Sequence, residues 1–156
     1  MSSHAGSTST RAKVLVVEDD DDMRRGLALR LRSFGYDVVV AQDGVGAVSV
    51  ARAERPDLVL LDIGLPAGNG LVVLERYANL PALCAIPVVV LTGQDPRTAE
   101  PAARRFHVAA FLRKPTGNDV LAETISRALQ GETIPAQYPA GRPAVDWSSW
   151  GGPSGL

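Results

Sequence analysis

A set of polar side chains stands where short apolar runs end. They are the carboxylates of Glu18, Asp19 and Asp62, the hydroxyl of Thr92 and the ammonium of Lys114. Parallel strands of an open α/β sheet end at one common edge, where such sheets bind their ligands. If the apolar runs are neighbouring parallel strands, these side chains meet at that edge. The combination predicts a site for a divalent cation and a phosphoryl group.

The acidic members of the set suit a magnesium ion. Mg²⁺ prefers oxygen ligands and keeps several waters, so one or two carboxylates together with phosphate oxygens suffice. Asp19 and Asp62 are the expected direct ligands. Glu18 could bind through water, and Gly64 could offer its backbone carbonyl just beyond Asp62. Runs of charged residues are usually solvated surface. The acidic run at residues 18–22, however, directly follows an apolar strand, which favours a cation site.

The other members suit phosphoryl transfer. Lys114 would place a point charge on one phosphoryl oxygen, and the Thr92 hydroxyl could donate a hydrogen bond to another. Asp62 would then be a nucleophile that forms an aspartyl-phosphate, with catalysis coming from positioning and charge stabilisation. Each residue alone is typical of an ordinary cap, strand end or surface position. The set is informative because its members close successive strands in order.

The elements that would position these side chains alternate along the chain. Strands are predicted at residues 14–17, 37–41, 58–61, 87–91 and 109–112. Helices are predicted at residues 21–34, 45–54, 71–77 and 118–130, with another that begins near Pro101, since proline is tolerated at a helix start. On the first helix the inward stripe is expected to be Met23, Leu27, Leu31 and Phe34. This β-α alternation indicates an α/β fold, a parallel sheet covered by helices on both faces.

Composition fits one domain with tails. The 156 residues carry 16 basic and 17 acidic side chains, so a net charge of -1 gives no support for nucleic-acid binding. No apolar stretch approaches the roughly 20 residues that span a bilayer, so no membrane partner is expected. The N-terminus lacks the apolar core of a secretory signal. The lone Cys84 excludes an intrachain disulfide, favours a reducing, cytoplasmic compartment, and is expected to be half-buried.

The two ends differ in composition from the segment between them. Residues 1–12 are predicted to be a disordered leader, and residues 132–156 a disordered tail that is rich in proline and glycine. Trp147 and Trp150 are the only large anchors of the tail, and they are either incidental or a docking element. The first alternative is preferred, so the tail is expected to be dispensable for the fold.

Four segments resemble the receiver domain of two-component response regulators. They are VLVVEDDDDMR at 14–24, DLVLLDIGLPAGNG at 57–70, PVVVLTGQ at 87–94 and FLRKP at 111–115. The resemblance covers residues 13–131 and implies a flavodoxin-like, doubly wound five-stranded sheet in the order 2-1-3-4-5. No segment after residue 131 resembles an output domain. The chain is therefore expected to be a stand-alone receiver similar to chemotaxis regulators.

The resemblance also implies roles for residues. It assigns Mg²⁺ binding to Glu18 and Asp19, phosphate acceptance to Asp62, switching to Thr92 and Phe111, phosphate binding to Lys114, and a cis peptide to the bond between Lys114 and Pro115. The expected phosphodonor is a histidine kinase or a histidine phosphotransfer protein. Phosphorylation is expected to change the binding of a downstream protein that the sequence does not name.

Two alternative functions use similar residues. A haloacid-dehalogenase-like phosphatase also uses a strand-end aspartate nucleophile, and it needs a DxD motif at the first strand, which the Asp run at 19–21 could mimic. It also needs a late acidic pair, but only isolated Asp119 and Asp146 follow Lys114, and Asp62 would have no role. A receiver-like binding module that is never phosphorylated would be expected to have lost part of the set. The chain is therefore expected to catalyse only its own phosphorylation and dephosphorylation.

Overall fold

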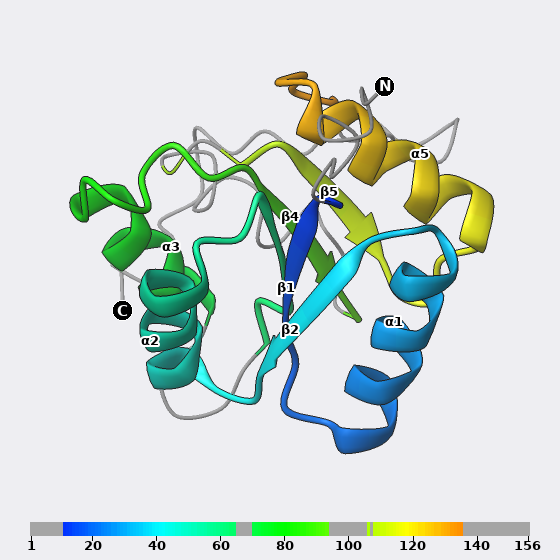
Figure 1. Cartoon of the computed structure of the whole chain (residues 1–156), viewed down its shortest axis with the longest axis horizontal. Helices are drawn as coiled ribbons and strands as arrows, with labels where there is room; N and C mark the ends of the chain where they lie inside the picture. Colours follow the sequence, from blue (N-terminus) through cyan, green and yellow to red (C-terminus); the bar gives the residue numbers. More distant parts are fainter. Residues whose placement is uncertain (1–10, 65–69, 94–105, 107, 136–156) are drawn as a thin grey trace, which may run out of the picture.

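The computed structural model shows a parallel five-stranded sheet with helices on both faces (Figure 1). It describes residues 11–64, 70–93, 106 and 108–135. The strand order is β2-β1-β3-β4-β5, and every neighbouring pair is parallel. This order confirms the predicted doubly wound α/β fold.

The elements follow the predicted alternation. The strands are β1 (Lys13–Val17), β2 (Asp37–Ala41), β3 (Leu58–Leu61), β4 (Val88–Thr92) and β5 (Ala110–Arg113). The helices are α1 (Asp21–Ser33), α2 (Gly44–Glu54), α3 (Gly70–Asn79) and α5 (Asn118–Leu129). The helix predicted near Pro101 lies outside the described residues, as do residues 1–10 of the leader and 136–156 of the tail.

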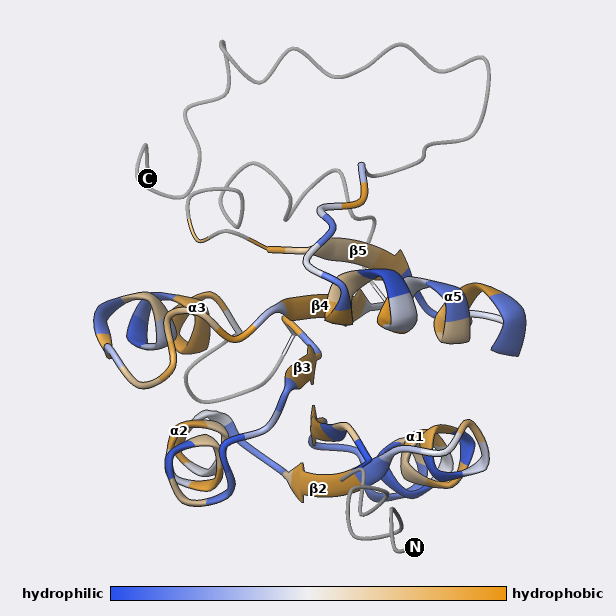
Figure 2. Cartoon of the chain, turned by 45° about the horizontal axis from the view of Figure 1, so that its top comes forward, coloured by the Kyte–Doolittle hydropathy of each residue, from blue (hydrophilic) through white to orange (hydrophobic). Residues whose placement is uncertain are grey.

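The sheet separates two hydrophobic cores. Helices α1 and α5 cover one face and α2 and α3 cover the other (Figure 2). Side chains alternate between the faces, so Val14 and Val16 pack with α1 and α5, whereas Leu15 and Val17 pack with α2 and α3. Because both faces are covered, each residue of β3 is buried. This burial explains the continuous apolar run that precedes Asp62.

Glycine is required where α3 meets the end of β3. A Cβ atom built on Gly70 would lie 2.5 Å from the Cα atom of Ile63 and 3.1 Å from the carbonyl oxygen of Asp62. The Gly70 amide donates to the Ile63 carbonyl at 3.0 Å. The start of α3 thus holds the backbone that carries Asp62.

Two side chains differ from the sequence-based expectation. Met23 is 40% exposed, because the first turn of α1 lies at the edge of the sheet, where its sulfur is 3.9 Å from the Lys114 Nζ atom. Cys84 is exposed rather than half-buried, because Leu83 takes the buried position in the turn after α3. Leu27 and Leu31 are buried as predicted.

The described chain continues past residue 131. The Ile134 amide donates to the Ala109 carbonyl at 2.7 Å, and its side chain packs against the core beneath α1 and α5. Arg127 forms an ion pair of 3.1 Å with Glu132. A test of the predicted tail should therefore begin after Pro135.

Over the residues that the structure describes, no helix combines the length and the apolar character needed to cross a membrane.

Candidate phosphoryl and metal site

Backbone hydrogen bonds place the predicted residues at one edge of the sheet. The Glu18 amide donates to the Ala41 carbonyl at 3.1 Å, one residue beyond the end of β1. The Asp62 amide donates to the Val17 carbonyl at 3.0 Å. The Lys114 amide likewise donates to the Thr92 carbonyl at 2.8 Å. These bonds continue the parallel ladders past the strand ends, so the polar side chains emerge together as the sequence predicts.

Lys114 lies between two carboxylates. Its Nζ atom forms a close ion pair with Glu18 Oε1 and lies 3.2 Å from Asp62 Oδ2. The exposed fractions of the Lys114, Glu18 and Asp62 side chains are 14%, 2% and 12%. Low exposure means that water screens these charges weakly. The ammonium therefore balances part of the negative charge of the site.

The environment shifts the pKa of both partners in the closest pair. Burial raises the pKa of the Glu18 carboxyl, although Lys114 and the Asp20 amide oppose the shift. Burial lowers the pKa of the Lys114 ammonium, but Glu18 and Asp62 outweigh it, so the net direction is upward. Lys114 therefore stays charged at neutral pH.

The acidic cluster suits a hard cation. Glu18, Asp19 and Asp62 each offer a carboxylate oxygen, and these oxygens lie within 4.8 Å of one another. Carboxylate oxygens are the ligands that Mg²⁺ prefers. Three carboxylates and one ammonium leave an excess of negative charge, which a divalent cation would neutralise. The donor set and its charge therefore fit the predicted metal.

Asp62 is held by its own turn. Its Oδ1 atom accepts a hydrogen bond from the Gly64 amide at 2.9 Å, while its Oδ2 atom faces Lys114. Both carboxylate oxygens are thus oriented before any ligand arrives. The contact of Gly64 is through its amide, and the predicted role of its carbonyl as a metal ligand stays a prediction.

The acidic run after β1 divides between different tasks. Asp19 belongs to the cluster with Glu18 and Asp62. Asp20 instead caps α1, because its Oδ1 atom accepts from the Met23 amide at 2.9 Å. Asp21 forms an ion pair with Arg24. Side chains at the start of a helix commonly satisfy its free amides, so the run reads as one motif in sequence but has several roles in the fold.

Thr92 and Phe111 lie on the two adjacent strands β4 and β5. Thr92 is fully buried at the end of β4 and pairs with Arg113. Phe111 pairs with Val90 and is partly buried against the core beneath α2 and α3. Phe111 therefore lies near the site along its strand, and the core encloses its side chain only in part. The switching roles of Thr92 and Phe111 stay predictions.

Two arginines of α1 contact the loops that carry the site, and the sequence analysis missed both. Arg24 donates to the Glu18 carbonyl at 2.9 Å. Arg30 donates to the Thr116 carbonyl at 2.7 Å, in the loop after Lys114, and to Asn118 Oδ1 at 2.6 Å, at the start of α5. The only signal for Arg24 was its position three residues after Asp21, a spacing that brings side chains together on a helix.

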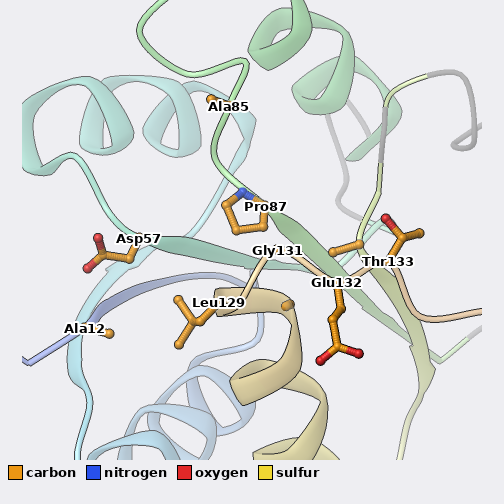
Figure 3. A pocket seen from close by; sticks show the side chains of 10 residues that line it. Ala12, Asp57, Ala85, Pro87, Leu129, Gly131, Glu132 and Thr133 are labelled. Atoms are coloured by element: carbon orange, nitrogen blue, oxygen red, sulfur yellow. The ribbon is translucent and has the colours of Figure 1, made fainter.

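A hollow of about 540 Å³ lies at the other end of the strands (Figure 3). Its lining includes Asp57 and Glu132 with several alanines. Both charges have partners, since Asp57 accepts from the Lys13 amide at 2.8 Å and Glu132 pairs with Arg127. None of the predicted site residues lines it, so it is separate from the acidic site.

Comparisons with known proteins agree with this geometry. A family model described as the response regulator receiver domain matches residues 14–126. Protein PilH from Pseudomonas aeruginosa is 32% identical over 120 residues, which cover 77% of this chain and 99% of PilH. The transcriptional regulatory protein GlrR from Escherichia coli is 32% identical over 134 residues, which cover 86% of this chain but 30% of GlrR.

One of the similar solved structures contains a magnesium ion. The receiver domain of the sensor histidine kinase PA1611 from Pseudomonas aeruginosa has a magnesium ion coordinated in its active site cleft. It matches with a TM-score of 0.71 and 25% identity over 77% of this chain and 98% of that chain. Together with the strand order, the acidic cluster and the bridging lysine, these matches show that the chain belongs to the response regulator receiver domain family, the phosphoacceptor modules of two-component signalling.

Proposed function

We propose that Asp62 is the residue that accepts the phosphoryl group, with a Mg²⁺ ion held by Glu18, Asp19 and Asp62. The observation that carries this proposal is the position of Lys114 between Glu18 and Asp62, beside carboxylate oxygens that lie within 4.8 Å of one another. A phosphoryl group on Asp62 would bring oxygens within reach of the same ammonium. Glu18 and Asp19 would remain to hold the cation.

The reaction requires little covalent chemistry from the protein. A carboxylate oxygen of Asp62 attacks phosphorus, a new O–P bond forms, and the N–P bond of a phosphohistidine on the donor breaks with the electron pair leaving on the imidazole. The imidazole then takes a proton from water. The Lys114 ammonium would pair with the Asp62 carboxylate before the transfer and with a phosphoryl oxygen after it. When bound, the cation would supply charge neutralisation at the same oxygens.

The chain would catalyse its own modification and its reversal. In the hydrolysis step, water attacks phosphorus and the O–P bond to Asp62 breaks, which restores the carboxylate and releases inorganic phosphate and a proton. The donor class is a histidine kinase or a histidine phosphotransfer protein, as expected for a receiver. The phosphatase alternative gains no support, because the family model that matches is the receiver domain.

The output would be a change in partner binding. Thr92 and Phe111 would transmit the presence of the phosphoryl group to the surface beside β4 and β5, where a downstream protein would bind. A receiver that works as a binding module without phosphate would not need Lys114 between two carboxylates.

The lone Cys84, which is exposed, supports a reducing, cytoplasmic location.

Intact mass measurement tests the assignment. The protein is incubated with Mg²⁺ and a small-molecule phosphodonor, and one added phosphoryl group is expected. Asp62→Asn should remove this added mass. Asp37→Asn, which changes an exposed aspartate at the far end of β2, should keep it. An added phosphoryl mass that persists in Asp62→Asn would show that another residue is the acceptor.

A further inference from the structure

Arg24 is bound into the loop that presents the acidic pair. Its Nη1 atom donates to the Glu18 carbonyl at 2.9 Å and lies 3.5 Å from the Asp19 carbonyl. Its Nη2 atom forms a close ion pair with the Asp21 carboxylate. Although it carries a full charge, the Arg24 side chain is only 14% exposed. One guanidinium thus contacts three residues of a four-residue segment.

These contacts determine the path of the backbone. A guanidinium presents its donors in a rigid planar fork, which an ammonium cannot reproduce. The fork of Arg24 is anchored on α1, so it fixes the carbonyls of Glu18 and Asp19 relative to that helix. A second bond supports the same curve, because the Asp20 amide donates to Glu18 Oε2 at 3.2 Å. With their carbonyls held back toward α1, the two carboxylates are kept toward Asp62.

We propose that Arg24 is a positioning residue for the metal site. It holds the backbone at residues 18–21 in the conformation in which Glu18 and Asp19 share a cation with Asp62. It touches neither the metal nor the phosphoryl group. The inference rests on the proposed function, which places Mg²⁺ at these three carboxylates.

Charge and geometry predict opposite effects, which makes the idea testable. If Arg24 acted only as a charge, its removal would make the acidic site more negative and Mg²⁺ would bind more tightly. If it positions the loop, its replacement lets the carboxylates move apart and Mg²⁺ binds more weakly. Arg25 is the matched control, since it is the adjacent residue of α1, is exposed, and has no hydrogen bond or ion pair to this loop in the described structure.

The experiment compares Arg24→Lys, Arg24→Met and Arg25→Met with the wild-type chain by calorimetric titration with Mg²⁺. Arg24→Lys should weaken binding about tenfold although it keeps the charge, near the lower limit for residues that orient metal ligands. Arg24→Met should also bind more weakly than wild type. Arg25→Met should bind equally or slightly more tightly. If Arg24→Lys binds like wild type, or Arg24→Met tightens binding as Arg25→Met does, the inference is wrong.

A second measurement uses the protein without metal. In ¹H–¹⁵N spectra, the Asp20 amide should shift and exchange faster with solvent in Arg24→Lys, because its bond to Glu18 depends on the same curve. Arg25→Met should leave it unchanged. An unchanged Asp20 amide in Arg24→Lys overturns the inference, whereas wild-type protein that binds no Mg²⁺ overturns the proposed function. Thermal unfolding identifies a misfolded variant, and Arg24→Lys carries the test if Arg24→Met does not fold.

Discussion

The contact between Lys114 and Glu18 combines stability and function in one pair of side chains. Glu18 is 1% exposed, so its carboxylate has little water around it. Lys114 is its counter-charge and also lies 3.2 Å from Asp62. Breaking a buried ion pair by removing one partner is strongly destabilising, because the remaining charge is left uncompensated.

Replacement of Lys114 should therefore destabilise the fold in a pH-dependent way. We expect Lys114→Met to lower the free energy of unfolding by about 3 kcal/mol near neutral pH. Loss of the ammonium raises the pKa of Glu18 further above its unfolded value. A raised carboxyl pKa means that stability is present at low pH and is lost as pH rises through the folded pKa, so the loss is larger at about pH 8 than at about pH 5.

Urea unfolding at the two pH values measures this difference. The control is Lys13→Met, which breaks a pair with Glu54 whose side chains are 33% and 43% exposed. Exposed pairs contribute up to about 1 kcal/mol, so this variant should show a small loss with little change between the two pH values. Equal losses for Lys114→Met at both pH values would contradict the role of Glu18.

At the scale of elements, the junction of β3 and α3 determines where Asp62 stands. Gly70→Ala should destabilise the fold by about 1–3 kcal/mol, the usual cost of adding atoms to a filled space. The added Cβ atom would meet backbone atoms of Ile63 and Asp62, which cannot move independently of the site. Phosphorylation should slow as well, since Asp62 would shift relative to Lys114.

Gly26→Ala provides the matched comparison. Gly26 lies inside α1, and a Cβ atom built there would meet no heavy atom within 4 Å outside the helix's own nearby backbone. Alanine in a helix interior is favoured over glycine by about 0.5–1 kcal/mol, so this variant should be more stable. Chemical denaturation and the rate of phosphorylation separate the two cases. A Gly70→Ala protein as stable and as active as wild type would show that the junction is more adaptable than its contacts suggest.

The strand ends were predictable from the sequence, because each is marked by residues that are adjacent along the chain. Each strand is a short apolar run, and its polar end residue follows directly, so Asp62 and Lys114 were found from the chain alone. The use made of Asp20 and Arg24 was not predictable in this way, since it depends on the direction in which α1 leaves the sheet. Cys84 was misplaced because the turn after α3 carries no periodic pattern from which an inward position can be derived.

At the scale of the whole molecule, the fold should not require the last 21 residues. We expect a chain that ends at Pro135 to unfold with a free energy within about 0.5 kcal/mol of the full chain. A chain that ends at Gly131 should lose about 1–2 kcal/mol, because Ile134 packs against the core and its amide pairs with Ala109. Thermal unfolding of the two truncations measures both. A loss of more than about 2 kcal/mol on removing only residues 136–156 would point to Trp147 or Trp150 as an anchor.

Phosphorylation should also change the conformation of residues away from Asp62. A phosphoryl group on Asp62 would be a new acceptor near the end of β4, and movement of Thr92 toward it would leave space for Phe111. One charge-assisted hydrogen bond contributes roughly 1.5–3 kcal/mol, which shifts a two-state equilibrium about 10- to 150-fold. Resonances of Phe111 and its neighbours should therefore move when beryllofluoride, a phosphate mimic, is added with Mg²⁺.

The same NMR experiment contains its controls. Ile125 is fully buried on the opposite face of the sheet, and its resonances should move little. Asp62→Asn should abolish the response, because the mimic needs the carboxylate. If only resonances around Asp62 move in the wild-type protein, the coupling to Phe111 does not exist.

The strand that carries Phe111 lies at one edge of the sheet, as β2 does at the other. In the described sheet, β5 pairs only with β4, whereas β1, β3 and β4 each pair on both sides. A displacement of β5 therefore disturbs one ladder of backbone hydrogen bonds, and a displacement of β3 would disturb two. Neighbouring side chains of β5 point into different layers, since Phe111 packs with α2 and α3 while Leu112 packs with α1 and α5. A small sliding of this outer strand would thus reach both surfaces of the domain while the inner strands stay fixed.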